Sequence, residues 1–190
     1  FFVGDEKNSV FLNRKKVQED LGMQHLYFAN LNHGTALFQV TTKNCEEKPF
    51  ADCLLTKGTK IGLAMTHADC QIALFYDPIE KLVCAVHAGW RGLVKNIYAK
   101  TVERCKQLGS KPENILVAIS ASLGKDHAEY LSYKKLFPKS HWKYFDEKSR
   151  GDLQSLAEEQ MRSSGVLSHH LEIDKTCTAC NEQRYFSYRK

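Results

Sequence analysis

The stretch QIALFYDPIEKLVCAVHAGWRGLVKNIYAKTVERCKQL, residues 71–108, decides the fold of this chain. Its first half contains two apolar runs, residues 71–76 and 81–87, which are separated by the turn signal Asp77-Pro78. Over residues 92–108 the apolar side chains recur at helical spacing. The stretch therefore predicts two strands and a helix, joined by a glycine-containing segment.

Further elements of both kinds are predicted outside this stretch. We expect helices at 13–21, 130–137 and 152–163, and strands at 27–31, 36–41, 60–65, 115–119, 171–173 and 185–188. Strands and helices mix without a strict βαβ order, which favours an α+β, layered mixed-sheet domain over a doubly wound one. A length of 190 residues suits one domain, 1–190, and the absence of an initiator Met at Phe1 predicts an incomplete N-terminus.

Charge and cysteine content narrow the class of protein. The net charge of +5 is spread along the chain rather than gathered in a stripe, which argues against nucleic-acid binding and suits a small anionic substrate such as phosphate. Seven cysteines without a visible signal peptide indicate reduced thiols. No apolar run approaches the roughly 18 residues of a membrane span. We expect a cytoplasmic protein, monomeric or homodimeric, that binds neither nucleic acid nor membranes.

Three motifs place a His or Cys at the end of an apolar strand: Asn32-His33-Gly34, Ala68-Asp69-Cys70 and the segment His87-Ala88-Gly89-Trp90-Arg91-Gly92. Two imidazoles and a thiolate suit zinc, and three protein ligands leave the fourth tetrahedral position open for water or substrate. We therefore predict a catalytic zinc on His33, Cys70 and His87, where a bound water can become a nucleophile. The alternative is three residues at the edge of the core, without a metal.

The Cys70 thiol also fits a different chemistry. With His87 as its base it would form the nucleophile of a metal-independent thiol hydrolase or deamidase. Asp69 would then orient the base or accept hydrogen bonds from the backbone.

The segment from His87 to Gly92 also predicts an anion site. Its two glycines indicate a tight turn into the following helix, whose N-terminal N–H groups favour an anion. The guanidinium of Arg91 adds a planar fork that fits phosphate oxygens, so we predict that Arg91 binds phosphate. Trp90 is expected in the core.

Other His and Cys residues receive structural predictions. Cys177 and Cys180 form a C-x₂-C pair, but a zinc ribbon needs a second pair and none has suitable spacing, so we expect a structural or incidental role. His127 is expected to be an exposed loop residue. His67 is expected beside the metal site without binding the metal.

These motifs, with Phe186-Ser187-Tyr188-Arg189, resemble the YfiH-like family, formerly called the multicopper polyphenol oxidase or laccase-domain family. The resemblance covers nearly the whole chain and implies an α/β/β/α layered mixed sheet. It places the zinc on His33, Cys70 and His87, with copper as an opportunistic occupant. It implies phosphorolysis of adenosine, inosine, guanosine or methylthioadenosine, with adenosine deamination as a side activity, and Asp69 is the candidate for proton transfer.

The chain departs from the family pattern in two places. Where the family has Gln-Val-His-Gly, this chain has Leu31-Asn32-His33-Gly34, and Asn32 becomes the candidate for a substrate contact at that position. The loop 120–127 lacks the family's prolines, although Glu129 stands where the family has its Glu. These departures leave open a third interpretation, a non-catalytic relative that binds a ligand.

Overall fold

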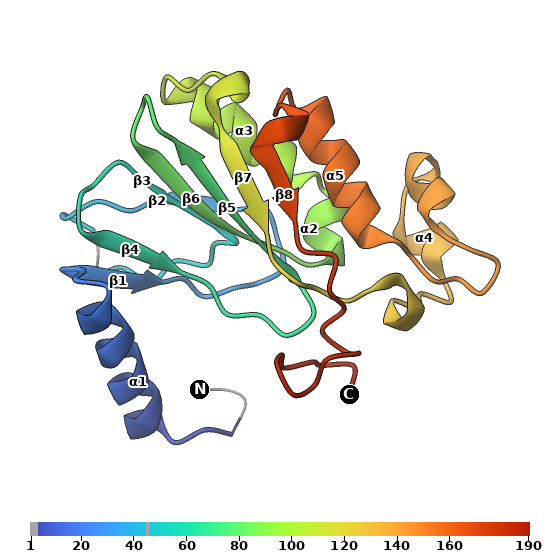
Figure 1. The fold of residues 1–190 in the computed structure, drawn as a ribbon, viewed down its shortest axis with the longest axis horizontal. Helices are drawn as coiled ribbons and strands as arrows, with labels where there is room; N and C mark the ends of the chain where they lie inside the picture. The colour runs from blue at the N-terminus through green and yellow to red at the C-terminus, as the bar shows by residue number, and fades with distance from the viewer. Residues whose placement is uncertain (1–3, 45) are drawn as a thin grey trace.

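A mixed sheet forms the centre of the computed structural model, which describes residues 4–44 and 46–190. Within these residues the sheet has six strands in the order β2-β3-β6-β5-β7-β8 (Figure 1). The inner pairs are antiparallel, and the outer pairs β2–β3 and β7–β8 are parallel. The strands are β2 Leu37–Gln39, β3 Cys53–Thr56, β5 Gln71–Asp77, β6 Leu82–Ala88, β7 Leu116–Ile119 and β8 Leu171–Ile173.

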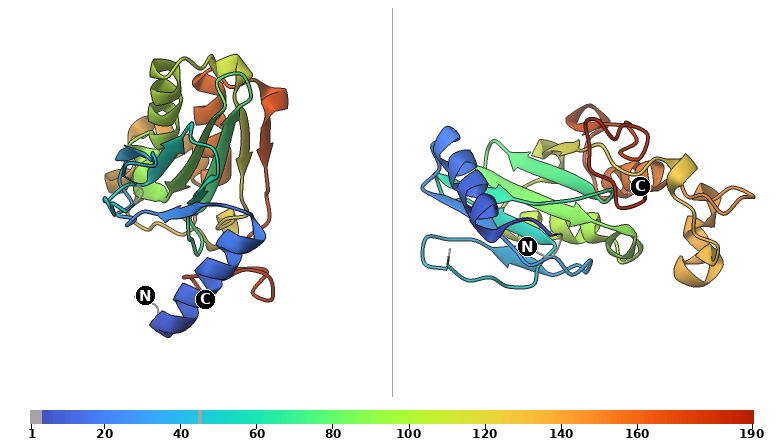
Figure 2. Two further views of the ribbon diagram at one scale, coloured as in Figure 1. Left: turned by 90° about the vertical axis from the view of Figure 1, so that its left-hand side faces the viewer. Right: turned by 90° about the horizontal axis from the view of Figure 1, so that it is seen from below.

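Helices α2 (Trp90–Val94), α3 (Ile97–Gln107) and α5 (Leu153–Ser163) cover one face of this sheet (Figures 1 and 2). In α3 the buried side chains recur at helical spacing, so one side of the helix joins the core. Helix α5 begins at a capping residue, because the side chain of Asp152 accepts a hydrogen bond of 2.9 Å from the backbone N–H of Ser155. This is the main core of the protein.

A second layer lies on the other face of the sheet. Strands β1 (His25–Phe28) and β4 (Ile61–Ala64) form a parallel pair that packs on β3 and β6, and helix α1 (Lys7–Asp20) contacts β1. Strand β3 serves both cores, since Leu55 packs on the helix side and Leu54 on the side of β1 and β4. The predicted α/β/β/α layering is confirmed.

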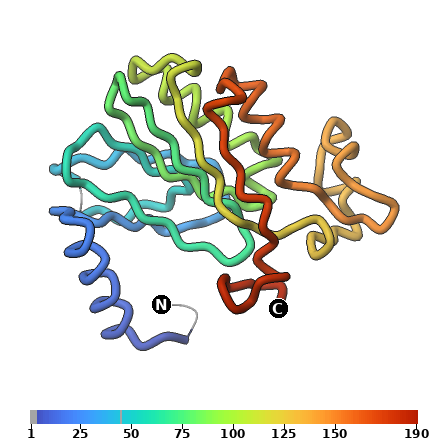
Figure 3. The backbone as a smooth tube through the Cα atoms, viewed as in Figure 1, coloured from blue at the N-terminus to red at the C-terminus, as the bar shows by residue number. Residues whose placement is uncertain are grey.

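Short elements connect these layers. They are η1 (Pro112–Asn114), η2 (Lys125–His127), α4 (Tyr133–Leu136), η3 (Lys139–Tyr144) and η4 (Ser168–His170). Beyond β8 the chain continues as a tail, residues 174–190, which is made of turns and irregular segments. The tail turns below the end of the strand (Figure 3). Among the described residues, no helix combines the length and the apolar character that crossing a membrane requires.

Several predicted elements need correction. The predicted helix 92–108 is broken into α2 and α3, because Asn96 adopts the left-handed conformation with φ 57°. The predicted strand 185–188 is wrong, since this part of the tail forms turns and its aromatic side chains lack a sheet to pack on. The predicted helix 130–137 shrinks to α4, and β3 was not predicted as a strand.

Candidate metal centre

His87 lies in the interior, at the end of strand β6. Strands β3 and β5 flank β6 and run antiparallel to it, so both begin where β6 ends. Asp52 directly precedes β3 and Cys70 directly precedes β5. The sheet topology therefore brings a carboxylate and a thiol to opposite sides of a buried imidazole.

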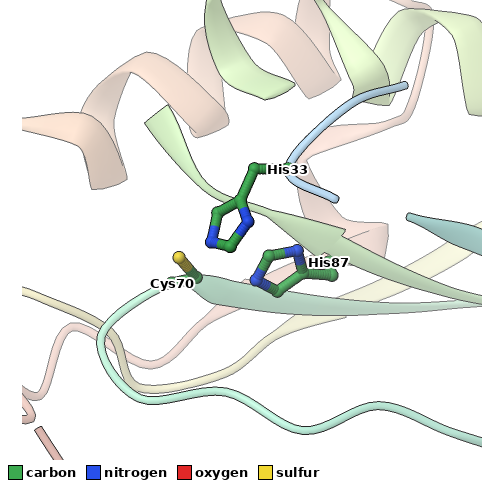
Figure 4. A group of neighbouring side chains, drawn as sticks. All are labelled: His33, Cys70 and His87. Carbon is green, nitrogen blue, oxygen red and sulfur yellow. The ribbon is translucent and has the colours of Figure 1, made fainter. Parts of the chain in front are cut away.

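The side chains of His33, Cys70 and His87 converge on one point (Figure 4). Their ligand atoms all lie within 4.8 Å of one another. Donor atoms around a single zinc ion stand roughly 3.3–3.7 Å apart, given Zn–N and Zn–S bonds of about 2.0 and 2.3 Å. Small side-chain adjustments suffice to surround an ion, so the three predicted ligands are close enough to bind one metal together.

Asp52 connects the two histidines. Its Oδ1 accepts hydrogen bonds of 2.9 Å from His87 Nδ1 and from the backbone N–H of His33, and its Oδ2 accepts one of 2.7 Å from the N–H of Gly34. Burial raises the pKa of Asp52, but the hydrogen bonds from His87 and Gly34 outweigh burial and hold the pKa below its usual range. An ionised Asp52 thus fixes the ring of His87 so that its other nitrogen faces Cys70 (Figure 4).

The two imidazoles have opposite pKa shifts. Burial lowers the pKa of His87, but hydrogen bonds with Asp52 and Cys70 outweigh it and raise the pKa to about 9. Burial and the neighbouring His87 lower the pKa of His33, and Arg91 adds to this effect. Without a metal, these shifts favour a protonated His87 and a neutral His33, and a metal bound to His87 would take the place of one of its ring protons.

His33 belongs to a turn that Asp52 holds in place. Its φ of 58° lies in the left-handed region, which is uncommon for a residue with a side chain. The hydrogen bonds from His33 and Gly34 to Asp52 stabilise this conformation. The strained turn aims the His33 ring at His87, with 4.9 Å between the ring centroids.

Cys70 is half-buried and follows another residue in the left-handed region, Asp69 with φ 83°. The carboxylate of Asp69 turns away from Cys70 toward the tail. It accepts hydrogen bonds of 2.6 Å from the hydroxyl of Thr178 and 2.9 Å from the backbone N–H of Arg189. His67 contacts the backbone carbonyl of Cys70 through Nδ1 at 2.6 Å. Asp69 and His67 thus shape the loop around the thiol.

Gly89 is required by the packing of the site. A Cβ atom at this position would lie 2.9 Å from His33 Cδ2 and 3.1 Å from Cys70 Sγ. The glycine therefore lets the chain pass between the two ligand residues as it enters α2.

A cavity of about 500 Å³ opens beside the three ligand residues. This volume lies within the range of small-molecule sites. Its wall combines two arginines, Arg91 and Arg189, with the aromatic rings of Trp90, Tyr130 and Tyr188. Arg91 lies 4.4 Å from the centre of the Trp90 ring, and Arg189 lies 5.6 Å from that of Tyr130. Flat apolar surfaces and positive charge suit a ligand with an aromatic part and an anionic part.

Of the predicted site residues, some line the cavity and others do not. Arg91 and Asp69 line the cavity, whereas Asn32 directs its Oδ1 to the N–H of Gly34 at 3.1 Å and lies outside the cavity wall. Its geometry points to stabilisation of the turn rather than to a substrate contact. Our sequence analysis missed Asp52 and Tyr130 as site residues.

The chain is similar to known proteins along its whole length. Residues 1–190 match the family described as multi-copper polyphenol oxidoreductase laccase. Purine nucleoside phosphorylase YlmD of Geobacillus stearothermophilus is 28% identical over 208 residues, an alignment that covers 99% of this chain and 76% of the relative. Purine nucleoside phosphorylase YlmD of Bacillus subtilis is 27% identical, with 99% and 74% covered.

Solved structures show the same architecture. The hypothetical protein YfiH of Bacillus licheniformis superposes with a TM-score of 0.90 at 27% identity, covering 98% of this chain and 78% of that one. YlmD of Geobacillus stearothermophilus gives a TM-score of 0.88 at 27% identity, with 98% and 77% covered. The layered fold is therefore shared along almost the whole chain.

Proposed function

We infer, since the chain belongs to the multi-copper polyphenol oxidoreductase laccase family, that it is a zinc-dependent purine nucleoside phosphorylase. The observation that carries this proposal is the convergence of His33, Cys70 and His87 at one point, where His33 and Cys70 share the wall of an aromatic cavity with Arg91. Relatives named purine nucleoside phosphorylase supply the substrate class. The proposed substrates are inosine, adenosine, guanosine or methylthioadenosine, together with inorganic phosphate.

The donor set fits zinc. A thiolate and two imidazoles match its borderline softness, and Asp52 already orients one imidazole as outer carboxylates do in metal sites. Zinc bound by His33, Cys70 and His87 would supply Lewis acidity to an oxygen nucleophile in the cavity.

Phosphate is held by the cationic part of the cavity. Arg91 presents a planar pair of N–H donors that match phosphate oxygens, and its stacking on Trp90 restricts the motion of the guanidinium. Arg189 adds a second positive charge on the wall of the cavity. The two arginines favour an anion beside the three ligand residues.

The purine is held by the aromatic part. Tyr130 is half-buried against Trp90, and Tyr188 is exposed at the rim. A phosphate oxygen forms a bond to C1′ of the ribose while the bond from C1′ to the purine nitrogen breaks. The electron pair of that bond leaves with the purine, which takes up a proton. The products are the free base and ribose 1-phosphate.

Adenosine deamination is proposed as a side activity of the same cavity. In this reaction the oxygen of water bonds to C6 of the purine, and the amino group leaves as ammonia. The same aromatic surfaces would hold the base, turned so that C6 faces the three ligand residues.

The test is phosphate-dependent release of purine base by the purified chain, with zinc measured by elemental analysis. We expect His33→Ala and Cys70→Ala to abolish release and reduce bound zinc, whereas His169→Ala, a change at an exposed histidine, leaves both unchanged. Unchanged phosphorolysis in Cys70→Ala would refute the proposal. Bound zinc without turnover of any of the four nucleosides would favour a non-catalytic relative.

A second candidate function rests on the Cys70, His87 and Asp52 arrangement, in which the thiol, the imidazole and the carboxylate follow one another. This order also suits a metal-independent thiol hydrolase or deamidase. The two chemistries differ in their response to iodoacetamide. A metal-bound Cys70 reacts only after zinc is chelated, whereas a nucleophilic Cys70 reacts at once and activity survives the chelator.

A further inference from the structure

A second group of metal-ligating side chains lies apart from the first. His127, Cys177 and Cys180 have ligand atoms that all lie within 4.8 Å of one another. His127 comes from the last residue of η2, and the two cysteines come from the tail that follows β8. The sequence does not predict this grouping, because the C-x₂-C pair lacks a second cysteine pair and the sequence around His127 predicts an exposed loop.

The two segments are bound to each other at several points. The backbone N–H of Ser122 donates to the carbonyl of Thr176 at 3.2 Å, and the N–H of Thr178 donates to the carbonyl of Ser122 at 3.0 Å. Beneath them Leu123, Ala128 and Ala179 form a small buried apolar cluster. The position of His127 relative to the cysteines is thus fixed by pairing and packing rather than by chance proximity.

The backbone holds the sulfur of Cys177 in place. The N–H of Gly124 donates a hydrogen bond to Cys177 Sγ at 3.2 Å. A Cβ atom on Gly124 would lie 2.8 Å from Cys177 Cβ, so the glycine permits this close approach. Asn181 closes the turn by donating from Nδ2 to the carbonyl of Cys177 at 2.9 Å.

The choice of ligand follows from the donor set. Two thiols at C-x₂-C spacing with an imidazole match the ligands of zinc sites. The pair of cysteines alone would also fit a redox-active disulfide, but a disulfide makes no use of an imidazole. Both thiols are free in this structure, and His127 is half-buried beside them. The presence of the third donor favours a metal.

We propose that His127, Cys177 and Cys180 form a second zinc site, which fastens the tail to the loop 120–128. Three protein ligands would leave one coordination position for a water molecule. This proposal does not rest on the proposed phosphorylase activity, because the two groups share no ligand.

The second site has a consequence for the cavity. Thr178, which lies between the two cysteines, donates a hydrogen bond from its hydroxyl to Asp69. Farther along the tail, Tyr188 and Arg189 line the cavity wall. A metal that fixes the start of the tail would therefore limit the motion of that wall.

The experiment counts zinc in the purified full chain after equilibration with zinc and dialysis. We expect two zinc ions per chain in the wild type and one in Cys180→Ala and His127→Gln, while the control His169→Gln keeps both. Cys70→Ala should lose the other zinc, so failure of the first site is distinguishable from failure of the second. A wild-type zinc content that Cys180→Ala and His127→Gln leave unchanged would overturn the proposal.

Alkylation gives a second readout. An exposed free thiol reacts readily with iodoacetamide, so zinc should slow modification of Cys180 by at least about tenfold until a chelator is added. Mass spectrometry of the peptide that contains both cysteines resolves the alternative. A Cys177–Cys180 disulfide that blocks alkylation until a reductant is added, with no effect of the chelator, would also overturn the zinc site.

Discussion

Asp52 accepts a 2.9 Å hydrogen bond from Nδ1 of His87, and both side chains are almost completely buried. The same carboxylate accepts the backbone N–H groups of His33 and Gly34. One side chain therefore sets the orientation of one candidate ligand and the backbone conformation of another. The geometry of the candidate metal centre therefore depends on a residue that does not itself belong to the group of ligands.

Asp52→Asn should weaken the metal centre more than any change to an exposed carboxylate. An amide cannot accept hydrogen bonds at both of its heteroatoms, so either His87 or the turn at His33 loses its partner. We expect zinc affinity at this site to fall by about 10–100-fold. We also expect the free energy of unfolding to fall by about 1–3 kcal/mol. Zinc competition with a chromogenic chelator and urea unfolding measure the two effects, and Asp20→Asn on α1 is the control.

Gly89→Ala should damage the site without straining the backbone. The φ of Gly89 is −74°, which alanine adopts freely, so the effect arises from the new Cβ pressing on His33 and Cys70. We expect zinc binding by His33, Cys70 and His87 to be lost, together with nucleoside turnover, while the fold is kept. Gly22→Ala is the control, because there alanine strains the backbone but crowds no side chain. Its φ of 61° makes alanine costly by about 1 kcal/mol, but open space surrounds the position and the site is distant. Equal zinc binding in the two variants would contradict this account.

The sequence predicts best where structure is decided locally. The two apolar runs around Asp77-Pro78 became β5 and β6, because both runs and the turn between them are encoded within a few neighbouring residues. The strand β3 was missed because it is only four residues long and has all its side chains buried, which removes the alternation. The aromatic tail at 185–188 has high strand propensity, yet Phe186 and Tyr188 are 88% and 87% exposed and have no sheet to join.

The residues of the candidate site also divide into those that the sequence predicts and those that it does not. The motifs containing His33, Cys70 and His87 could be found because residue types with metal chemistry stand in short motifs next to apolar runs. The role of Asp52 could not, since it lies 35 residues from His87 and acts through a contact that exists only after β3 and β6 pair. The contact of Asp69 with Arg189 spans 120 residues. Long-range hydrogen bonds of this kind leave no local pattern in the sequence.

Arg91→Ala should raise the KM for phosphate far more than the KM for the nucleoside. The guanidinium is the candidate phosphate ligand, and charged hydrogen bonds of about 1.5–3 kcal/mol correspond to a factor of roughly 10–150. Arg91→Lys should recover only part of this loss, because an ammonium lacks the planar fork. Initial rates at varied phosphate and fixed inosine give the constants, with Arg162→Ala on α5 as the control. A larger effect on the KM for inosine would assign Arg91 to the nucleoside instead.

Asp77 should contribute a pH-dependent part of the stability. Burial raises the pKa of Asp77, but the Ser110 side chain and the backbone N–H groups of Glu80 and Ile79, aided by Lys57, outweigh burial and hold the pKa below its usual range. A carboxylate whose pKa is lower in the folded than in the unfolded state stabilises the folded state. This contribution is fully present above the unfolded pKa and disappears as the pH falls through the folded pKa.

We therefore expect Asp77→Asn to lose about 1–2 kcal/mol at neutral pH, and the difference from wild type to shrink in acid. Urea unfolding across the acid range measures the trend, with Asp20→Asn as the control. A difference that stays constant with pH would mean that the charge of the Asp77 carboxylate does not contribute to the free energy of unfolding.

Asp69→Asn distinguishes two roles for a carboxylate beside the thiol. If Asp69 transferred a proton, the variant would lose kcat and change the pH profile of the reaction. The hydrogen bonds that Asp69 accepts from Thr178 and from the backbone N–H of Arg189 favour the second role, in which Asp69 positions the tail. We then expect a raised KM for the nucleoside, a nearly unchanged kcat and an unshifted pH profile, because Tyr188 and Arg189 move out of the cavity wall.

Thr178→Val provides the matched variant for this prediction. It removes the hydroxyl that donates to Asp69 and leaves the carboxylate in place, so it should reproduce the raised KM of Asp69→Asn in a weaker form. The two changes made together should cost little more than Asp69→Asn alone, since both break the same link. Steady-state kinetics of the two single variants and the double variant test the coupling. Strictly additive effects would separate Thr178 from Asp69 and return the proton-transfer role to consideration.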